Sequence, residues 1–115
     1  FHTYTGPPLA CAAIVSTIKK IKKDNILKNV KRIEKKLLNS QINNSRKVKE
    51  VRGVGALFAV ELFNEFPNLQ NSLLANNLLV AIEKNSLIPI APPLNSSLNE
   101  IDNVLSHISK TINKS

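Results

Sequence analysis

The spacing of apolar residues changes once along this chain, from a helical spacing to an unbroken run. Before residue 38 the isoleucines and leucines recur every three or four positions, whereas residues 56–60 read ALFAV. A run of that length between turn-forming residues is typical of a strand buried on both faces. The chain, at 115 residues the size of one domain, is therefore predicted to be an α/β or α+β sandwich with a small sheet under helices.

Two amphipathic helices are predicted before the apolar run. The first covers 9–23, with Ile14, Ile18 and Ile21 on one face and prolines at its start, where no amide hydrogen is needed. The second is expected to have Asp24 as its N-cap. Its apolar face consists of Ile26, Val30, Ile33 and Leu37. The polar stretch 39–45 is expected to be a surface loop.

Strands are predicted over 47–62, with Gly53 and Gly55 forming a tight bend between two of them. A helix over 66–77 follows, and two short apolar runs at 78–82 and 87–91 could add strands. Pro89 lacks the amide hydrogen that a central strand needs, so its strand is expected to be an edge strand or to be broken.

A last helix is predicted from the pair Ser97 and Glu100, which form a capping box. The residues expected to face inward are Ile101, Val104, Leu105, Ile108 and Ile112. His107 is expected to be a partly exposed residue of this helix.

The charge of the chain is strongly positive and unevenly distributed. The net charge is +8, and twelve of the sixteen basic residues lie between Lys19 and Lys49, which suggests a polyanionic partner. However, the four Phe and one Tyr are not interleaved with the basic run as a base-stacking surface requires. We therefore interpret the run as a solvated lysine-rich helix face, and a small basic nucleic-acid-binding module is the alternative.

Catalytic and metal-binding patterns are weak. His2 and His107 are far apart, the eight carboxylates are scattered, and no metal-ligand spacing is present. The single cysteine, Cys11, lies among alanines and is interpreted as a small buried residue. A lone thiol and the lack of a long apolar stretch favour a reducing, cytoplasmic location.

One candidate site is the polar cluster that precedes the first helix. Residues 2–6, HTYTG, place hydroxyls and amides just before a helix start, where a phosphate can bind. A simple polar turn that caps the helix is the alternative.

Three segments of the chain resemble class III pyridoxal-phosphate-dependent aminotransferases. Residues 2–13, HTYTGPPLACAA, are similar to the family segment His-Thr-Tyr-Ser/Thr-Gly-His/Asn-Pro-Leu-Ala-Cys-Ala-Ala. Residues 51–62, VRGVGALFAVEL, and 90–94, IAPPL, resemble a strand pair and the segment before the last helix. Within the family, the segments are most like those of acetylornithine and ornithine aminotransferases.

The resemblance implies that the chain is the C-terminal portion of a fold-type I enzyme. Residues 1–23 would then be the helix leading from a large domain, and residues 24–115 the small domain. The chain begins at Phe1 without a methionine, which also suggests the end of a longer protein. The resemblance further implies that Thr3 binds the phosphate of pyridoxal 5'-phosphate in the other subunit of a homodimer.

The chain departs from the family pattern in ways that affect the expected chemistry. The family's Schiff-base lysine lies upstream of the threonine, so it is expected outside this chain, and the chain alone is expected to be inactive. Pro89 stands where the family has an arginine that binds the substrate carboxylate, and Pro7 replaces a His or Asn. The expected reaction is transfer of an amino group from an ornithine-like amino acid or amine to a 2-oxo acid. An inactive, decayed fragment of such an enzyme is the alternative.

Overall fold

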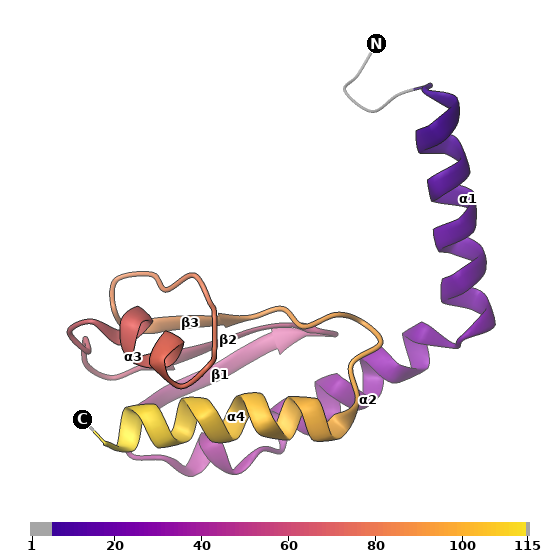
Figure 1. Cartoon of the computed structure of the whole chain (residues 1–115). Helices are drawn as coiled ribbons and strands as arrows, with labels where there is room; N and C mark the ends of the chain where they lie inside the picture. The colour runs from indigo at the N-terminus through magenta and orange to yellow at the C-terminus, as the bar shows by residue number, and fades with distance from the viewer. Residues whose placement is uncertain (1–5, 115) are drawn as a thin grey trace.

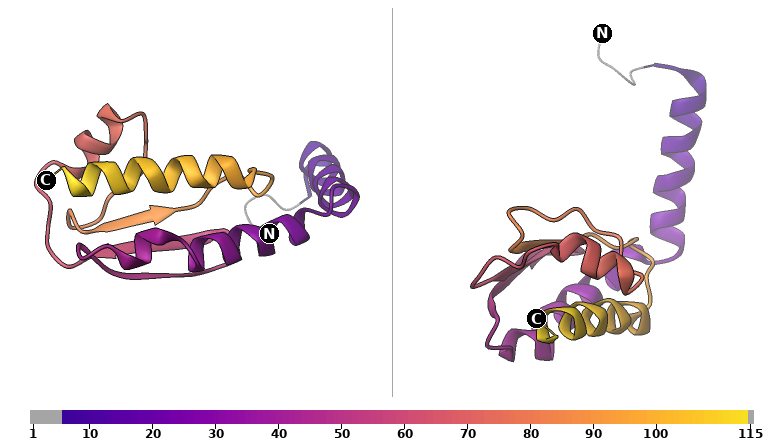
Figure 2. Two further views of the ribbon diagram at one scale, coloured as in Figure 1. Left: turned by 90° about the horizontal axis from the view of Figure 1, so that it is seen from below. Right: turned by 60° about the vertical axis from the view of Figure 1, so that its left-hand side comes forward.

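The computed structural model describes residues 6–114, which form helices packed on one face of a three-stranded sheet. Figure 1 shows α1 standing away from the rest of the molecule, and Figure 2 shows α2 and α4 running side by side. In chain order the elements are α1 (Pro8–Lys23), α2 (Ile26–Leu38), the 3-10 helix η1 (Gln41–Asn44), β1 (Val48–Val54), β2 (Leu57–Leu62), α3 (Leu69–Ala75), β3 (Leu87–Ile90) and α4 (Leu98–Asn113).

The sheet is antiparallel in the order β1-β2-β3, so β2 is central and β3 is an edge strand. This arrangement confirms the expected position of Pro89. Along β2, Phe58, Val60 and Leu62 are buried, whereas Leu57 is 64% exposed. The prediction that the 56–60 run is buried on both faces was wrong, because helices cover only one face of the sheet within residues 6–114.

The core lies between that covered face and the helices α2, α3 and α4. Ile33 and Leu37 from α2, and Ile108 and Ile112 from α4, are fully buried. These residues occupy the predicted inward positions, and Ser97 and Glu100 form the predicted capping box at the start of α4. The small sheet under helices confirms the predicted fold class.

Helix α1 forms as predicted but buries none of its residues. Its apolar face is open to solvent, and Ile14 and Ile18 are 55% and 48% exposed. Cys11 is also exposed, so the prediction that it is a small buried residue was wrong. The projecting helix gives a radius of gyration of 16.8 Å, larger than the roughly 13 Å expected for a compact chain of about this size.

Two local predictions around α2 differ from the structure. Asp24 ends α1 and forms an ion pair with Lys20 at 2.6 Å, whereas Asn25, with a φ of 50°, is the N-cap of α2. Asparagine adopts this left-handed conformation more readily than most residues, which explains the shift by one position. The stretch 39–45 contains η1, where Ile42 is buried, rather than only a surface loop.

The region between β2 and β3 holds less regular structure than predicted. Helix α3 covers only Leu69–Ala75, because Asn68 and Asn77 adopt left-handed conformations on either side. Residues 78–82 do not form a strand, and the nearest β-type pairing is an isolated bridge between Glu83 and Leu87. This segment is packed against the core by its side chains, with no neighbouring strand to pair with.

Candidate functional site

The predicted cofactor ligand, Thr3, lies outside the described residues, as do His2, Tyr4 and Thr5. The first described part of this segment is Gly6, followed by Pro7 at the exposed N-terminus of α1. The N-terminal end of a helix carries a partial positive charge that favours a phosphate nearby. The local backbone is therefore compatible with the expected anion, although the side chain that would bind it is not described.

The second candidate position, Pro89, lies on the open face of the sheet. Pro89 is paired with Ala59, and Ala59 is paired with Arg52, so the three residues form one row across the three strands. Neighbouring strands are about 4.8 Å apart, which places the backbone of Arg52 roughly 10 Å from that of Pro89. The register thus brings two segments of the family resemblance together on one surface.

The charged side chains of this open face are paired with one another. Glu61 Oε1 accepts a hydrogen bond from Lys49 Nζ at 2.7 Å, and Glu61 Oε2 accepts one from Arg52 Nη1. Arg52 Nη1 also donates to Glu50 Oε2 at 2.9 Å. Two cations and two carboxylates leave this cluster without net charge, so a carboxylate ligand next to Pro89 would meet no unpaired cation from it.

Hydrogen bonding explains the titration behaviour of this cluster. The bonds from Lys49, and then from Arg52, lower the pKa of Glu61 below its ordinary value of 4.5. The hydrogen bond to Glu61, and to a smaller extent the one to Glu50, raises the pKa of Arg52 above its ordinary value. Arg52 therefore links β1 to β2 through its hydrogen bond to Glu61.

The turn between β1 and β2 is fixed from two sides. Gly55 has a φ of 60° and donates its amide to Glu34 Oε2 of α2 at 3.0 Å. Gly53 lies within β1 opposite Phe58, and a Cβ atom there would lie 2.6 Å from the Phe58 ring. The predicted bend is thus formed around Gly55, whereas Gly53 permits close packing of the strands.

The loop after β3 is held by a residue that the sequence analysis did not identify. Asn29 Nδ2 of α2 donates to the carbonyl oxygens of Leu94 at 2.8 Å and of Ser96 at 2.9 Å. The residues it joins are more than sixty positions apart, so no local pattern could have indicated the contact. Asn29 fixes the Pro-Pro-Leu segment, and hence the end of β3, against α2.

The remaining candidates do not form a site within residues 6–114. His107 is partly exposed, as predicted, and its Nδ1 lies 2.5 Å from the carbonyl oxygen of Asn103. No group of three metal-ligating side chains occurs in the described part of the chain. None of its helices is long and apolar enough to cross a lipid bilayer.

The arrangement of these elements is that of an aminotransferase domain. The (S)-enantioselective omega-transaminase of Thermomicrobium roseum superimposes on 99% of the chain with a TM-score of 0.85, at 23% identity. The ornithine delta-aminotransferase of Plasmodium falciparum does so over 98% of the chain, with a TM-score of 0.83 and 28% identity. The chain corresponds to 29% and 30% of these two structures, respectively.

The sequence comparison identifies the family. The model of the family "Aminotransferase class-III" matches residues 2–112, and the chain belongs to this family. An acetylornithine aminotransferase of Clostridium acetobutylicum is 30% identical over 96% of the chain. The chain spans about 30% of the length of that relative. The match confirms the resemblance stated from the motifs. Enzymes of this family depend on pyridoxal phosphate.

Proposed function

We propose that the chain is the C-terminal part of an aminotransferase that moves an amino group from an ornithine-like amino acid or amine to a 2-oxo acid. The observation that carries this proposal is the family match over residues 2–112, which includes all three motif segments. Relatives named acetylornithine and ornithine aminotransferase support the ornithine-like donor.

In the proposed domain organisation, residues 1–23 connect a large domain to the small domain of residues 24–115. Two observations support it: α1 buries no residue, and its apolar side chains Leu9 and Ile14 are 84% and 55% exposed. Exposed apolar surface of this kind is typical of a protein contact. The large domain is the proposed partner of this face.

Thr3 is the proposed cofactor-binding residue, and it would act across a homodimer on the phosphate of the other subunit's pyridoxal phosphate. The exposed N-terminus of α1, only a few residues away, supports an anion in this region. When bound, the cofactor supplies an electron sink for chemistry at the amino-bearing carbon. The role proposed for this chain is to hold the phosphate and so orient the cofactor.

Pro89 is proposed to alter donor selection. An arginine side chain donates two parallel hydrogen bonds to a carboxylate, whereas a proline side chain has no hydrogen-bond donor. The charged cluster around Glu61 is internally paired, so it offers no substitute. Donors that bind without a carboxylate at this position, such as simple amines, are therefore proposed alongside ornithine-like amino acids.

The lysine that binds the cofactor covalently is proposed to lie outside residues 1–115, so these residues alone would be inactive. A cytoplasmic location remains a prediction. The first test is to mix purified residues 1–115 with pyridoxal phosphate, treat the mixture with borohydride, and map the adducts by mass spectrometry. No specific lysine adduct is expected, and a single fully labelled lysine would refute the proposal.

The second test uses the gene's full reading frame and measures amino transfer to a 2-oxo acid from ornithine, N-acetylornithine and a simple amine. Thr3→Ala is expected to weaken cofactor retention, whereas Thr5→Ala, the matched control, is expected to leave it unchanged. Pro89→Arg is expected to favour carboxylate-bearing donors over the amine. Absence of transfer from every donor would contradict the proposed function.

A further inference from the structure

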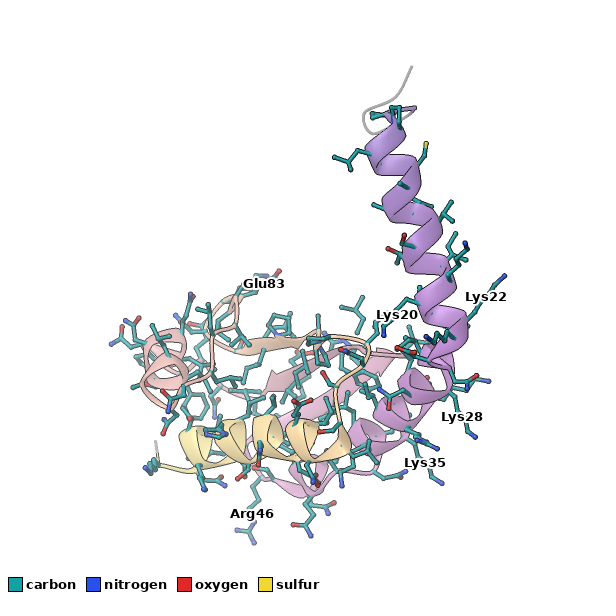
Figure 3. The ribbon with its side chains drawn as sticks, turned by 45° about the vertical axis from the view of Figure 1, so that its right-hand side comes forward. Lys20, Lys22, Lys28, Lys35, Arg46 and Glu83 are labelled. Carbon is teal, nitrogen blue, oxygen red and sulfur yellow. The ribbon has the colours of Figure 1, made fainter. Side chains whose placement is uncertain are left out.

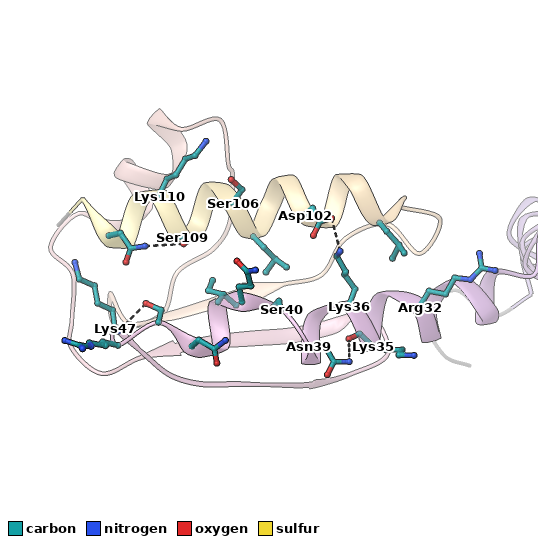
Figure 4. A pocket seen from close by; sticks show the side chains of 18 residues that line it. Arg32, Lys35, Lys36, Asn39, Ser40, Lys47, Asp102, Ser106, Ser109 and Lys110 are labelled. Atoms are coloured by element: carbon teal, nitrogen blue, oxygen red, sulfur yellow. Dashed lines mark hydrogen bonds and ion pairs between the residues drawn. The ribbon is translucent and has the colours of Figure 1, made fainter.

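The lysine-rich segment has no role in the proposed reaction, but the fold gathers much of its charge around one groove. The groove has a volume of about 1470 Å³ and runs between α2 with η1 on one side and α4 on the other. Figure 4 shows Arg32, Lys35 and Lys47 along one wall and Lys110 on the other. Figure 3 shows Lys35 and Arg46 projecting from the surface.

The charges that line this groove are strongly unbalanced. The cations are Arg32, Lys35, Lys36, Arg46, Lys47 and Lys110, and the one carboxylate among the described lining residues is Asp102. Asp102 is paired with Lys36 at 2.9 Å. The C-terminal ends of α2 and α4 also lie here and add about one unit of negative charge between them. Lys47 Nζ donates to the carbonyl oxygen of Ile112 at 2.6 Å, so Lys47 is left out of the balance. A surplus of about three positive charges remains, carried by Arg32, Lys35, Arg46 and Lys110.

The other lining residues show which anion this surface fits. Most are hydrogen-bonding serines, asparagines and a glutamine, and no aromatic residue is among the described residues that line the groove. A docked acidic peptide would also need exposed apolar side chains, but Ile42 and Leu105 are buried and Leu98, at 38%, is the one exposed apolar side chain among the described lining residues. Phosphate oxygens, in contrast, are bound by cations, hydroxyls and amides together.

We propose that this groove binds the phosphodiester backbone of a nucleic acid, without reading its bases. Lysine and arginine contacts to phosphates give affinity that is independent of sequence, and a surface without aromatic residues offers no platform on which bases stack. The site is separate from the open face of the sheet and from α1, so it would add a second property to the proposed enzyme.

The test measures binding of labelled single-stranded and double-stranded oligonucleotides to the protein by fluorescence anisotropy. The groove variant is Lys35→Gln/Arg46→Gln/Lys110→Gln, whose three exposed side chains form no ion pair within residues 6–114. The matched control, Lys19→Gln/Lys22→Gln/Lys23→Gln, removes the same charge from exposed positions of α1. A third variant, Ser106→Lys, adds a cation at an exposed position of the groove wall.

We expect the groove variant to bind at least about tenfold more weakly. The slope of log K against the logarithm of the salt concentration should become less steep by roughly 2 to 3, because three phosphate contacts are lost. The control should change affinity by less than about twofold, and Ser106→Lys should tighten binding. Binding of either strand form supports the proposal, and the two arms show which form is preferred. The proposal would be overturned if both triple variants lost the same affinity, or if no binding occurred at moderate salt. It would also be overturned if polyglutamate competed as well as an unlabelled oligonucleotide.

Discussion

Replacing Gly53 by alanine tests the packing of the β1–β2 pair, which carries one of the family motifs. The added Cβ would lie 2.2 Å from the carbonyl oxygen of Leu57 and 2.6 Å from the Cα of Phe58. Both are backbone atoms, so the contact is relieved only when the two strands move apart. Phe58 is 2% exposed, so that movement would also disturb the core.

The expected size of the effect follows from these contacts. Overpacking a rigid site costs about 1–3 kcal/mol and sometimes more, and contact with backbone atoms places Gly53→Ala at about 3 kcal/mol. Gly55→Ala is the matched control, because its Cβ meets only the Val30 side chain at 3.1 Å. The left-handed φ of Gly55 costs alanine about 1–2 kcal/mol, and reduced unfolded-state entropy offsets part of this cost.

The assay is urea unfolding of the wild type and both variants, followed by circular dichroism, with the free energies of unfolding compared at a common m-value. For a chain of this length, 3 kcal/mol corresponds to a melting temperature lower by about 12 °C, and 1 kcal/mol to about 4 °C. If Gly53→Ala destabilises no more than Gly55→Ala, the close approach of β1 and β2 at this position is refuted.

Three further outcomes are expected. Ile33→Ala should destabilise by about 2–5 kcal/mol in urea unfolding because a fully buried side chain is removed, whereas Leu27→Ala, at a 66% exposed position of the same helix, should change stability by less than about 0.5 kcal/mol. Ser97→Ala should cost about 1 kcal/mol by loss of the cap, and Ser97→Asp should restore most of it. The lowered pKa of Glu61 means that its charge stabilises the fold above pH 4.5 and that this contribution is lost as pH falls through the lowered value. The stability difference between wild type and Glu61→Gln should therefore shrink on acidification below pH 4.5, and a difference that is constant with pH would contradict the role of this ion pair.

Helices were predicted well where one periodic face sufficed to define them. The faces that contain Ile33 in α2 and Ile108 in α4 have a helical spacing and are buried as expected. The capping box at Ser97 is also local, because its two hydrogen bonds join residues three positions apart. In these elements, the residues that determine the structure lie within a few turns of one another.

The errors at 56–60 and 78–82 occur where the outcome depends on what lies across the sheet or beside the segment. An apolar run such as 56–60 does not show whether one face or two are covered, and Leu57 proved exposed. The segment 78–82 has apolar residues but no adjacent strand to pair with. Both outcomes depend on tertiary contacts, which the local sequence does not indicate.

The candidate site shows the same division. The resemblance identified Thr3 and Pro89 by position, and only the strand register revealed that Pro89, Ala59 and Arg52 share a row. The charge pairs of Arg52 with Glu50 and Glu61 could have been suspected once β1 and β2 were aligned, because alternate residues of a strand share a face. The pair of Lys49 with Glu61 lies next to a register shift between Val48 and Glu50, which simple alternation does not predict. The contact of Asn29 with Leu94 joins distant segments and could not have been suspected.

Because α1 projects from the rest of the molecule, a small rotation at its C-terminal end produces a large displacement at its N-terminal end. Its sixteen residues span about 24 Å at a rise of about 1.5 Å per residue, and the chain passes from this helix to α2 through Asp24 and Asn25. Over that length, a rotation of about 10° at the junction moves Gly6 by roughly 4 Å. The left-handed backbone of Asn25, at the opposite end of the helix from Gly6, therefore sets where Gly6 lies relative to the sheet.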